Sequence, residues 1–173
     1  LIDADVERAV ARATEAVETF GRTFERELLS RMRRKIGLDS AEEGDLALIH
    51  ALLDAMQKGE ADYTLTFRRL ADAAADPAAD DRVAGLFGEP ELYRDWAAGW
   101  RARLERDPLA PAERAAAMRR VNPAIIPRNH RVEQALEAAV ERGDLAPFRE
   151  LLEALRRPYD EPSARFAAYA EPP

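Results

Sequence analysis

The sequence predicts an all-α fold, an irregular array of about six to eight helices with a long N-terminal helix. Through most of the 173 residues, apolar side chains recur every three or four positions, which is the spacing of one face of a helix. No segment shows the sustained alternation of apolar and polar residues, rich in β-branched side chains, that is typical of a strand. No repeat of fixed period is apparent.

The first helix is expected from Asp5 to Lys35. Gly37 can take the left-handed conformation that ends a helix, and the cations of "RMRRK" lie where the helix dipole favours positive charge. We weigh this interpretation of the cations above a nucleic-acid patch, because the chain is acidic. The apolar stripe of this helix consists of Val6, Val10, Ala13, Val17, Phe20, Phe24, Leu28 and Met32.

A second helix is expected to end at Gly59, opened by Ser40 and Glu43 at the spacing of a capping box. His50 lies beside its apolar stripe, and we interpret it as a packed residue rather than a metal ligand, since no second ligand is near in sequence. Asp62 or Thr64 can cap a short third helix.

Turn-forming residues gather at 77–90. Pro90 suits the first turn of a fourth helix. Two tryptophans in that helix could form a base-stacking platform, but an aromatic stripe at helical spacing more often packs in a core. The expected inward side consists of Leu92, Trp96, Trp100 (or Gly99) and Leu104 (or Arg103).

Three further helices are expected. The first begins near Pro111, the second covers 128–142, and the last begins at Asp144 or Leu145 and is stopped by Pro158. Residues 159–173 are rich in proline and are expected to form a tail over the surface or a mobile end. The inward residues of the last two helices would be Val132, Leu136, Ala139 (or Ala135), Val140, Phe148, Leu151, Leu152 and Leu155.

These elements suggest a division into four parts. Residues 1–76 would form the long helix and a helical hairpin, and 77–90 a loop or linker. Residues 91–158 would form a helical subdomain and 159–173 the tail, all within one compact helical domain of a longer protein. The start at Leu1, without an initiator methionine and already at the entry to a helix, supports that expectation.

The composition argues against several functions. A formal net charge of -7 disfavours general binding to nucleic acid or to anionic membranes. With no cysteine and two histidines, thiolate nucleophiles and histidine-rich zinc sites are not expected. No apolar run reaches the length of a membrane helix. We assign no catalytic, cofactor-binding or metal-binding residue.

The stretch "VNPAIIPRN", residues 121–129, has the features of a stiffened connection between helices. Asn122 before Pro123 should be extended and can cap a turn that Pro123 begins, and Pro127 can repeat this for the next helix. Arg128 and Asn129 could bind a ligand, but such groups more often hold backbone carbonyls or a buried carboxylate.

Four motifs in order, "MRRKIGL", "DYTLTFR", "VNPAIIPRN" and "LRRPYDEP", resemble the C-terminal region of the selenoprotein-O (SelO) family. The resemblance covers about residues 18–162. It implies a parent protein with a kinase-like fold that binds ATP with magnesium or manganese and transfers AMP to hydroxyl side chains of proteins. The family's nucleotide-binding residues lie upstream of the matched region, so none is assigned here.

The resemblance implies that this chain is a scaffolding and substrate-contacting part, without catalytic activity of its own. Its partners would be the catalytic lobe of the same parent chain and protein substrates, and the isolated chain could self-associate. The location would be the cytoplasm of a bacterium, or mitochondria in a eukaryote. The candidates for structural or interface roles are Asp62, Thr64, Arg68, Asn122, Pro123, Arg128 and Asn129.

Two other functions are compatible with the sequence. The long first helix could offer its stripe to a partner helix in a stand-alone protein–protein interaction module. The interpretation of the chain as a helical nucleic-acid binder is supported only by "RMRRK" and the tryptophans.

Overall fold

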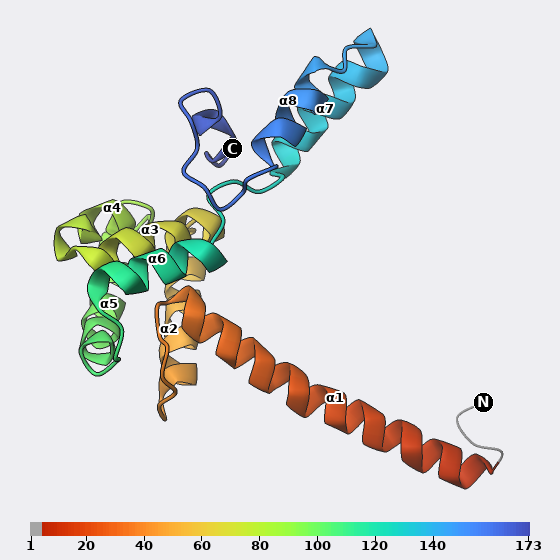
Figure 1. The fold of residues 1–173 in the computed structure, drawn as a ribbon, viewed down its shortest axis with the longest axis vertical. Helices are drawn as coiled ribbons and strands as arrows, with labels where there is room; N and C mark the ends of the chain where they lie inside the picture. Colours follow the sequence, from red (N-terminus) through yellow and green to blue (C-terminus); the bar gives the residue numbers. More distant parts are fainter. Residues whose placement is uncertain (1–4) are drawn as a thin grey trace.

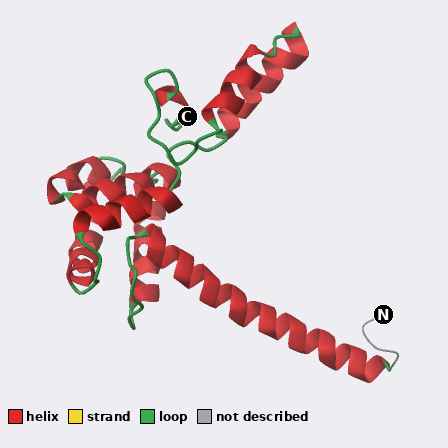
Figure 2. Ribbon diagram, viewed as in Figure 1, coloured by secondary structure: helices red, strands yellow, loops and turns green. Residues whose placement is uncertain are grey.

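The computed structural model describes residues 5–173, and every regular element within them is helical (Figure 2). This confirms the predicted all-α array. Residues 1–4, where the sequence suggests the entry to the first helix, lie outside the described residues. Figure 1 shows a body of packed helices from which α1 and the pair α7 and α8 project in different directions.

The elements follow one another without strands between them in the described part of the chain. They are α1 (Val6–Lys35), α2 (Asp45–Lys58), α3 (Tyr63–Ala75), η1 (Pro77–Ala79), α4 (Asp80–Ala84), α5 (Pro90–Glu105), α6 (Pro111–Val121), α7 (Asn129–Arg142), α8 (Ala146–Ala154) and η2 (Ala167–Tyr169).

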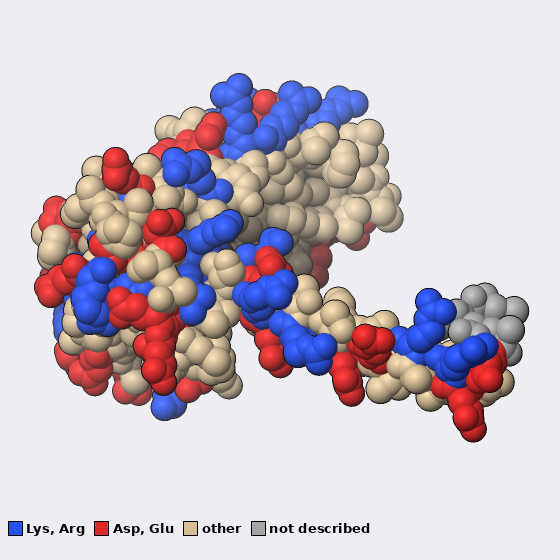
Figure 3. Space-filling view, turned by 60° about the horizontal axis from the view of Figure 1, so that its bottom comes forward, with Lys and Arg blue, Asp and Glu red and all other residues tan. Residues whose placement is uncertain are grey.

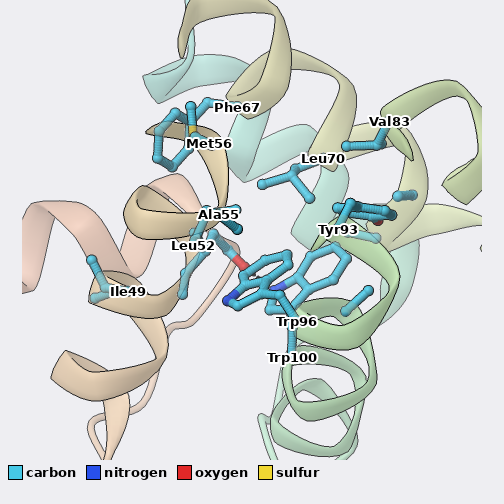
Figure 4. Packing of buried hydrophobic residues seen from close by; sticks show 14 of the residues in the cluster. Ile49, Leu52, Ala55, Met56, Phe67, Leu70, Val83, Tyr93, Trp96 and Trp100 are labelled. Atoms are coloured by element: carbon cyan, nitrogen blue, oxygen red, sulfur yellow. Dashed lines mark hydrogen bonds between the residues drawn. The ribbon is translucent and has the colours of Figure 1, made fainter. Parts of the chain in front are cut away.

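The core of the body lies where α2, α3 and α5 meet (Figure 4). Trp96 and Trp100 stack with ring centroids 5.2 Å apart, and both are buried. The Trp100 indole N–H donates to the carbonyl of Ile36 at 2.8 Å, which ties α5 to the end of α1. The interpretation of the two tryptophans as core residues is confirmed.

Two predicted helix boundaries are confirmed by their hydrogen bonds. Asp62 caps α3, because its Oδ1 accepts from the amide of Leu65 at 2.8 Å. Gly37 follows the end of α1 with φ +80°, and the amide of Leu38 then donates back to the carbonyl of Arg33 at 2.9 Å.

The predicted capping box at the start of α2 is wrong. The helix begins at Asp45 after Gly44, and the residue before it makes no side-chain cap. Ser40 instead donates from both its amide and its hydroxyl to Oδ2 of Asp107, each at 3.0 Å. The carboxylate of Asp107, 67 residues away, therefore accepts hydrogen bonds from the serine that its spacing predicted as a local helix cap.

Residues 77–90, expected as a loop or linker, contain η1 and α4. Both pack against α3, and α4 also packs against α5. The division of the chain into four parts stays a prediction. At the other end, residues 159–173 turn back toward the body, and Ala170 is buried against Ile125 and Ala154.

The inward faces predicted for α7 and α8 are partly wrong. Leu136 and Val140 are 55% and 83% exposed. Ala135, one of the predicted alternatives, is buried, and so is Ala138, which was not predicted. On α8, Leu151 is buried as expected, but Phe148 and Leu152, also predicted inward, are 49% and 50% exposed. Small alanine side chains allow the two helices to approach closely, and most of the bulky apolar residues face away. The helix α8 also ends at Ala154, before Pro158.

Candidate functional site: an interface where four motifs meet

The four sequence motifs come together in space. The end of α1, the start of α3, the segment after α6 and the segment after α8 meet where α7 and α8 join the body (Figure 1). We call this place the motif junction. Its side chains are Lys35, Asp62, Arg68, Asn122 and Arg128, none of them more than partly exposed.

Arg68 is the centre of the motif junction. Its side chain extends from α3 and is 9% exposed. The guanidinium Nη1 donates to the backbone carbonyls of Arg119, Asn122 and Tyr159, at 3.2, 3.0 and 3.1 Å. Nη2 donates to Oε1 of Glu161 at 2.5 Å. One arginine therefore holds the end of α6 and the segment after α8 against α3.

Asn122 and Lys35 join α1 to the segment after α6. The Asn122 amide donates to the carbonyl of Lys35 at 2.9 Å and accepts from the Lys35 amine at 2.8 Å. That amine also lies 4.7 Å from the ring centroid of Phe67, a cation–π contact. Burial lowers the pKa of Lys35.

The role predicted for Asn122 and Pro123 is therefore wrong in one respect. Asn122 is extended, as expected before proline, but its side chain binds the free carbonyl at the end of α1. No helix begins at Pro123, and α7 starts only at Asn129. Distant groups accept some of the hydrogen bonds that hold this connection in place. Examples are the amides of Ala124 and Ile125, which both donate to the carbonyl of Pro158.

Arg128 joins the base of α7 to α3 and to the tail. Its two terminal nitrogens donate to the two carboxylate oxygens of Asp62, at 2.8 and 3.0 Å. The same guanidinium donates to the carbonyl of Ala170 at 2.8 and 3.1 Å. Asp62 also caps α3, so one carboxylate fixes a helix start and an arginine 66 residues away.

The structure brings Asp62, Arg68, Asn122 and Arg128 together but not the remaining candidates. Asn129 is exposed at the first turn of α7. The asparagine that binds a backbone carbonyl is Asn122 instead. Thr64 is buried in the first turn of α3, where its backbone amide lies near Asp62. Sequence reasoning missed Lys35, although it lies within one of the four motifs.

We expect Asn122→Ala to lower the free energy of unfolding by about 1 to 3 kcal/mol, because the buried carbonyl of Lys35 and its amine each lose a partner. Chemical denaturation measures the change. Asn129→Ala is the matched control, since the same atoms are removed at an exposed position, and should change it by less than about 0.5 kcal/mol. Equal effects of the two substitutions would contradict the assignment.

Stability at low pH should depend on Asp62. Burial alone would raise the pKa of this carboxyl, but hydrogen bonds from Arg128 and the Leu65 amide outweigh burial and hold the pKa below its ordinary value. Such a group contributes stability that is complete above its unfolded pKa, about 4, and is lost as pH falls through the folded pKa. Asp62→Asn should thus be less stable at neutral pH and lose less stability on acidification.

Urea denaturation between about pH 2 and pH 6 measures this pH dependence. The control is Asp54→Asn, at an exposed position of α2. If Asp62→Asn loses as much stability as the unchanged chain over this range, the ion pair with Arg128 does not set the acid sensitivity.

A second surface of interest runs along α1. Its apolar stripe projects from the body over most of its length, and we call these residues the α1 stripe: Val6, Val10, Val17, Phe20, Phe24 and Leu28, which are between 47% and 77% exposed. The stripe leads into a groove of about 680 Å³ between α1 and α2. Leu29, Met32, Leu46, Ile49 and Leu53 are among the residues that line this groove.

The charged residues and potential metal ligands of the described part of the chain point to no further site beside these two surfaces. Over the visible face of the body, lysine and arginine are interspersed with acidic residues (Figure 3). Within residues 5–173, no group of three or more His, Asp or Glu side chains could hold a metal ion. In the same residues, no helix is both long enough and apolar enough to cross a membrane.

The chain belongs to the SelO family. The family model described as protein adenylyltransferase SelO matches residues 5–156, which confirms the resemblance drawn from the four motifs. Proteins named protein nucleotidyltransferase YdiU are similar over the whole chain. The relative from Rhizobium etli is 55% identical, that from Rhizobium meliloti 51% and that from Rhodopseudomonas palustris 46%. The chain spans only 34% to 35% of the length of these relatives.

Proposed function

We propose that these residues form the C-terminal helical part of a protein adenylyltransferase, which transfers AMP from ATP to hydroxyl side chains of proteins. The family match and the names of the relatives support nucleotidyl transfer by the parent protein. ATP and magnesium or manganese would be bound by parts of the parent outside this chain. The proposed location is the bacterial cytoplasm, because ATP is abundant there and the similar relatives are bacterial.

The role of the chain itself is to support the catalytic lobe. The observation that carries this proposal is the exposed α1 stripe on a chain that spans about a third of its relatives. Burying one large apolar side chain contributes about 1.5 to 3 kcal/mol, so six exposed ones favour a permanent partner. The remaining two thirds of the parent supply such a partner within the same chain.

Substitution of Phe20 and Phe24 in the full-length parent tests this role. Their rings stack 6.1 Å apart near the middle of α1. Phe20→Glu combined with Phe24→Glu should lower the melting midpoint of the parent and reduce AMP transfer in proportion to the folded protein that is lost. Thr19→Glu adds the same side chain on the opposite side of α1 and serves as the control. Unchanged stability and activity of the double variant would overturn the supporting role.

A second candidate function is a stand-alone interaction module, favoured by the same α1 stripe and by its length of 30 residues. In that case a helix of another protein would cover the stripe. The mass of the native protein in its source cell separates the two. An immunoblot band near 19.3 kDa would favour the module, and a band about three times heavier the adenylyltransferase.

A further inference from the structure

The helices α7 and α8 form an arm. Most of its larger apolar side chains face outward, whereas in a free helical hairpin they would lie between the two helices. Ala135, Ala138 and Ala154 are buried in or next to the contact between them. Most of the larger apolar side chains face away from this contact, although Leu151 is buried. We call them the arm face: Leu136, Val140, Leu145, Phe148 and Leu152, which are between 47% and 83% exposed.

The residues of the arm face lie on one side of the arm. Each residue of a helix is rotated by about 100° from the one before it. Viewed along each helix from its N-terminus, Leu136 and Val140 are therefore rotated in one direction from the buried side of α7. Phe148 and Leu152 are rotated in the same direction from the buried side of α8. Because the two helices run antiparallel, these equal rotations place all four residues on the same side.

Charged residues border the arm face and also occupy the other side of the arm. By the same rotation, Glu141 of α7 and Glu150 and Glu153 of α8 point away from the arm face. Charged residues also border the arm face, because Glu133 and Glu137 lie beside Val140, and Arg149 lies beside Leu145. Figure 3 shows a side of the arm, facing the open space beside α1, that is covered mainly by uncharged side chains. The arm thus presents a cluster of exposed apolar side chains bordered by charged ones, the arrangement of an interface with an apolar centre and a polar rim.

The arm is also held out from the body rather than folded onto it. The bonds of Arg128 to Asp62 and to the carbonyl of Ala170 fix the start of α7. Those of Arg68 to the carbonyls of Asn122 and Tyr159 fix both connections to the arm. A mobile hairpin would not need buried ion pairs at its base, so the position of the arm suits a permanent partner.

We propose that the arm face docks on the part of the parent chain that lies outside residues 1–173. This inference rests on the proposed function and extends it, because it adds a second contact to that of the α1 stripe. The occupant lies within the same chain for two reasons. The helices have 14 and 9 residues, lengths at which helices depend on tertiary packing, and two thirds of the parent remain to supply that packing.

Docking of both the α1 stripe and the arm face would restrict motion at the motif junction of the parent. The α1 stripe and the arm face lie on either side of the motif junction along the chain, so docking of both would hold the junction rigidly against the catalytic part. The junction would then transmit no hinge motion between α1 and the arm.

Hydroxyl-radical footprinting of the full-length parent tests the docking directly. Phe148 is 49% exposed in this chain, so burial in the parent should slow its oxidation about fivefold relative to that exposure, in proportion to the area removed from water. Denatured parent gives the unprotected rate. Oxidation of Phe148 and Leu152 at the rate expected for half-exposed side chains would overturn the proposal. Protection that disappears on dilution would also overturn it and assign the face to a second copy.

Substitution provides an independent test in the same full-length protein. Val140→Glu should lower the melting midpoint by about 3 °C or more, whereas Gln134→Glu, at an exposed position outside the arm face, should leave it unchanged. Equal midpoints for the two variants would contradict docking. Transfer of AMP by the unsubstituted parent is measured separately: activity with an unprotected arm face refutes the docking alone, and protection without activity refutes the enzymatic function alone.

Discussion

Replacing Arg68 by alanine is expected to lower the free energy of unfolding by about 3 to 5 kcal/mol, the range for removing one member of a buried polar network. The substitution leaves the carbonyls of Arg119, Asn122 and Tyr159 without the donor that each now has. It also removes the bonds of α3 to the end of α6 and to the segment after α8, so the arm loses one of its two attachments to α3.

Chemical denaturation of the 173-residue chain measures this effect. Glu161→Gln removes only the charge of the fourth partner, whose side chain is 73% exposed, and should change stability by less than about 1 kcal/mol. A loss of less than about 1 kcal/mol for Arg68→Ala would mean that water satisfies the three carbonyls equally well, and Arg68 would not be the centre of the junction.

Trp100→Ala is expected to lower stability by about 3 to 5 kcal/mol, as for other fully buried aromatic residues. Trp100 is 0% exposed, and the substitution would leave a cavity between α5 and the end of α1. It would also leave the buried carbonyl of Ile36 without its donor. The two losses act at the same place, where α1 joins the body.

Trp100→Phe separates these two contributions. Phenylalanine keeps most of the aromatic volume but donates no hydrogen bond to Ile36, so a smaller loss of about 1 to 3 kcal/mol is expected. Both variants are compared by the midpoint and slope of urea denaturation. If Trp100→Phe is as destabilising as Trp100→Ala, the hydrogen bond rather than the packing dominates at this position.

The features that could be predicted from the sequence are those decided by neighbouring residues. The end of α1 at Gly37 and the cap at Asp62 depend on groups within five positions along the chain. The burial of Trp96 and Trp100 follows from their spacing on one face of α5. In each case local geometry leaves few alternatives, and the structure agrees.

The features that could not be predicted depend on distant partners. The spacing of Ser40 allows a local helix cap, but in the structure Ser40 binds Asp107, 67 residues away. Asn122 binds the end of α1 across 87 residues. The outward direction of Leu136 and Val140 was hidden for a different reason: an amphipathic pattern shows which side is apolar but not which neighbour covers it.

The motif junction was predictable only in part. Sequence motifs selected Asp62, Arg68, Asn122 and Arg128 as structural candidates, but spacing alone could not pair Asp62 with Arg128 or aim Arg68 at three carbonyls. Such pairings depend on the packing of α3 against α6. The role of these residues as an interface in the parent stays a prediction.

Nucleotidyl transfer is tested by the transfer of radioactive label from ATP to protein by the full-length parent with magnesium or manganese. We expect labelled protein when the label is on the α-phosphate and no labelled protein when it is on the γ-phosphate, because AMP rather than phosphate is transferred. Label from the γ-phosphate, or no label from either by folded parent, would contradict the account.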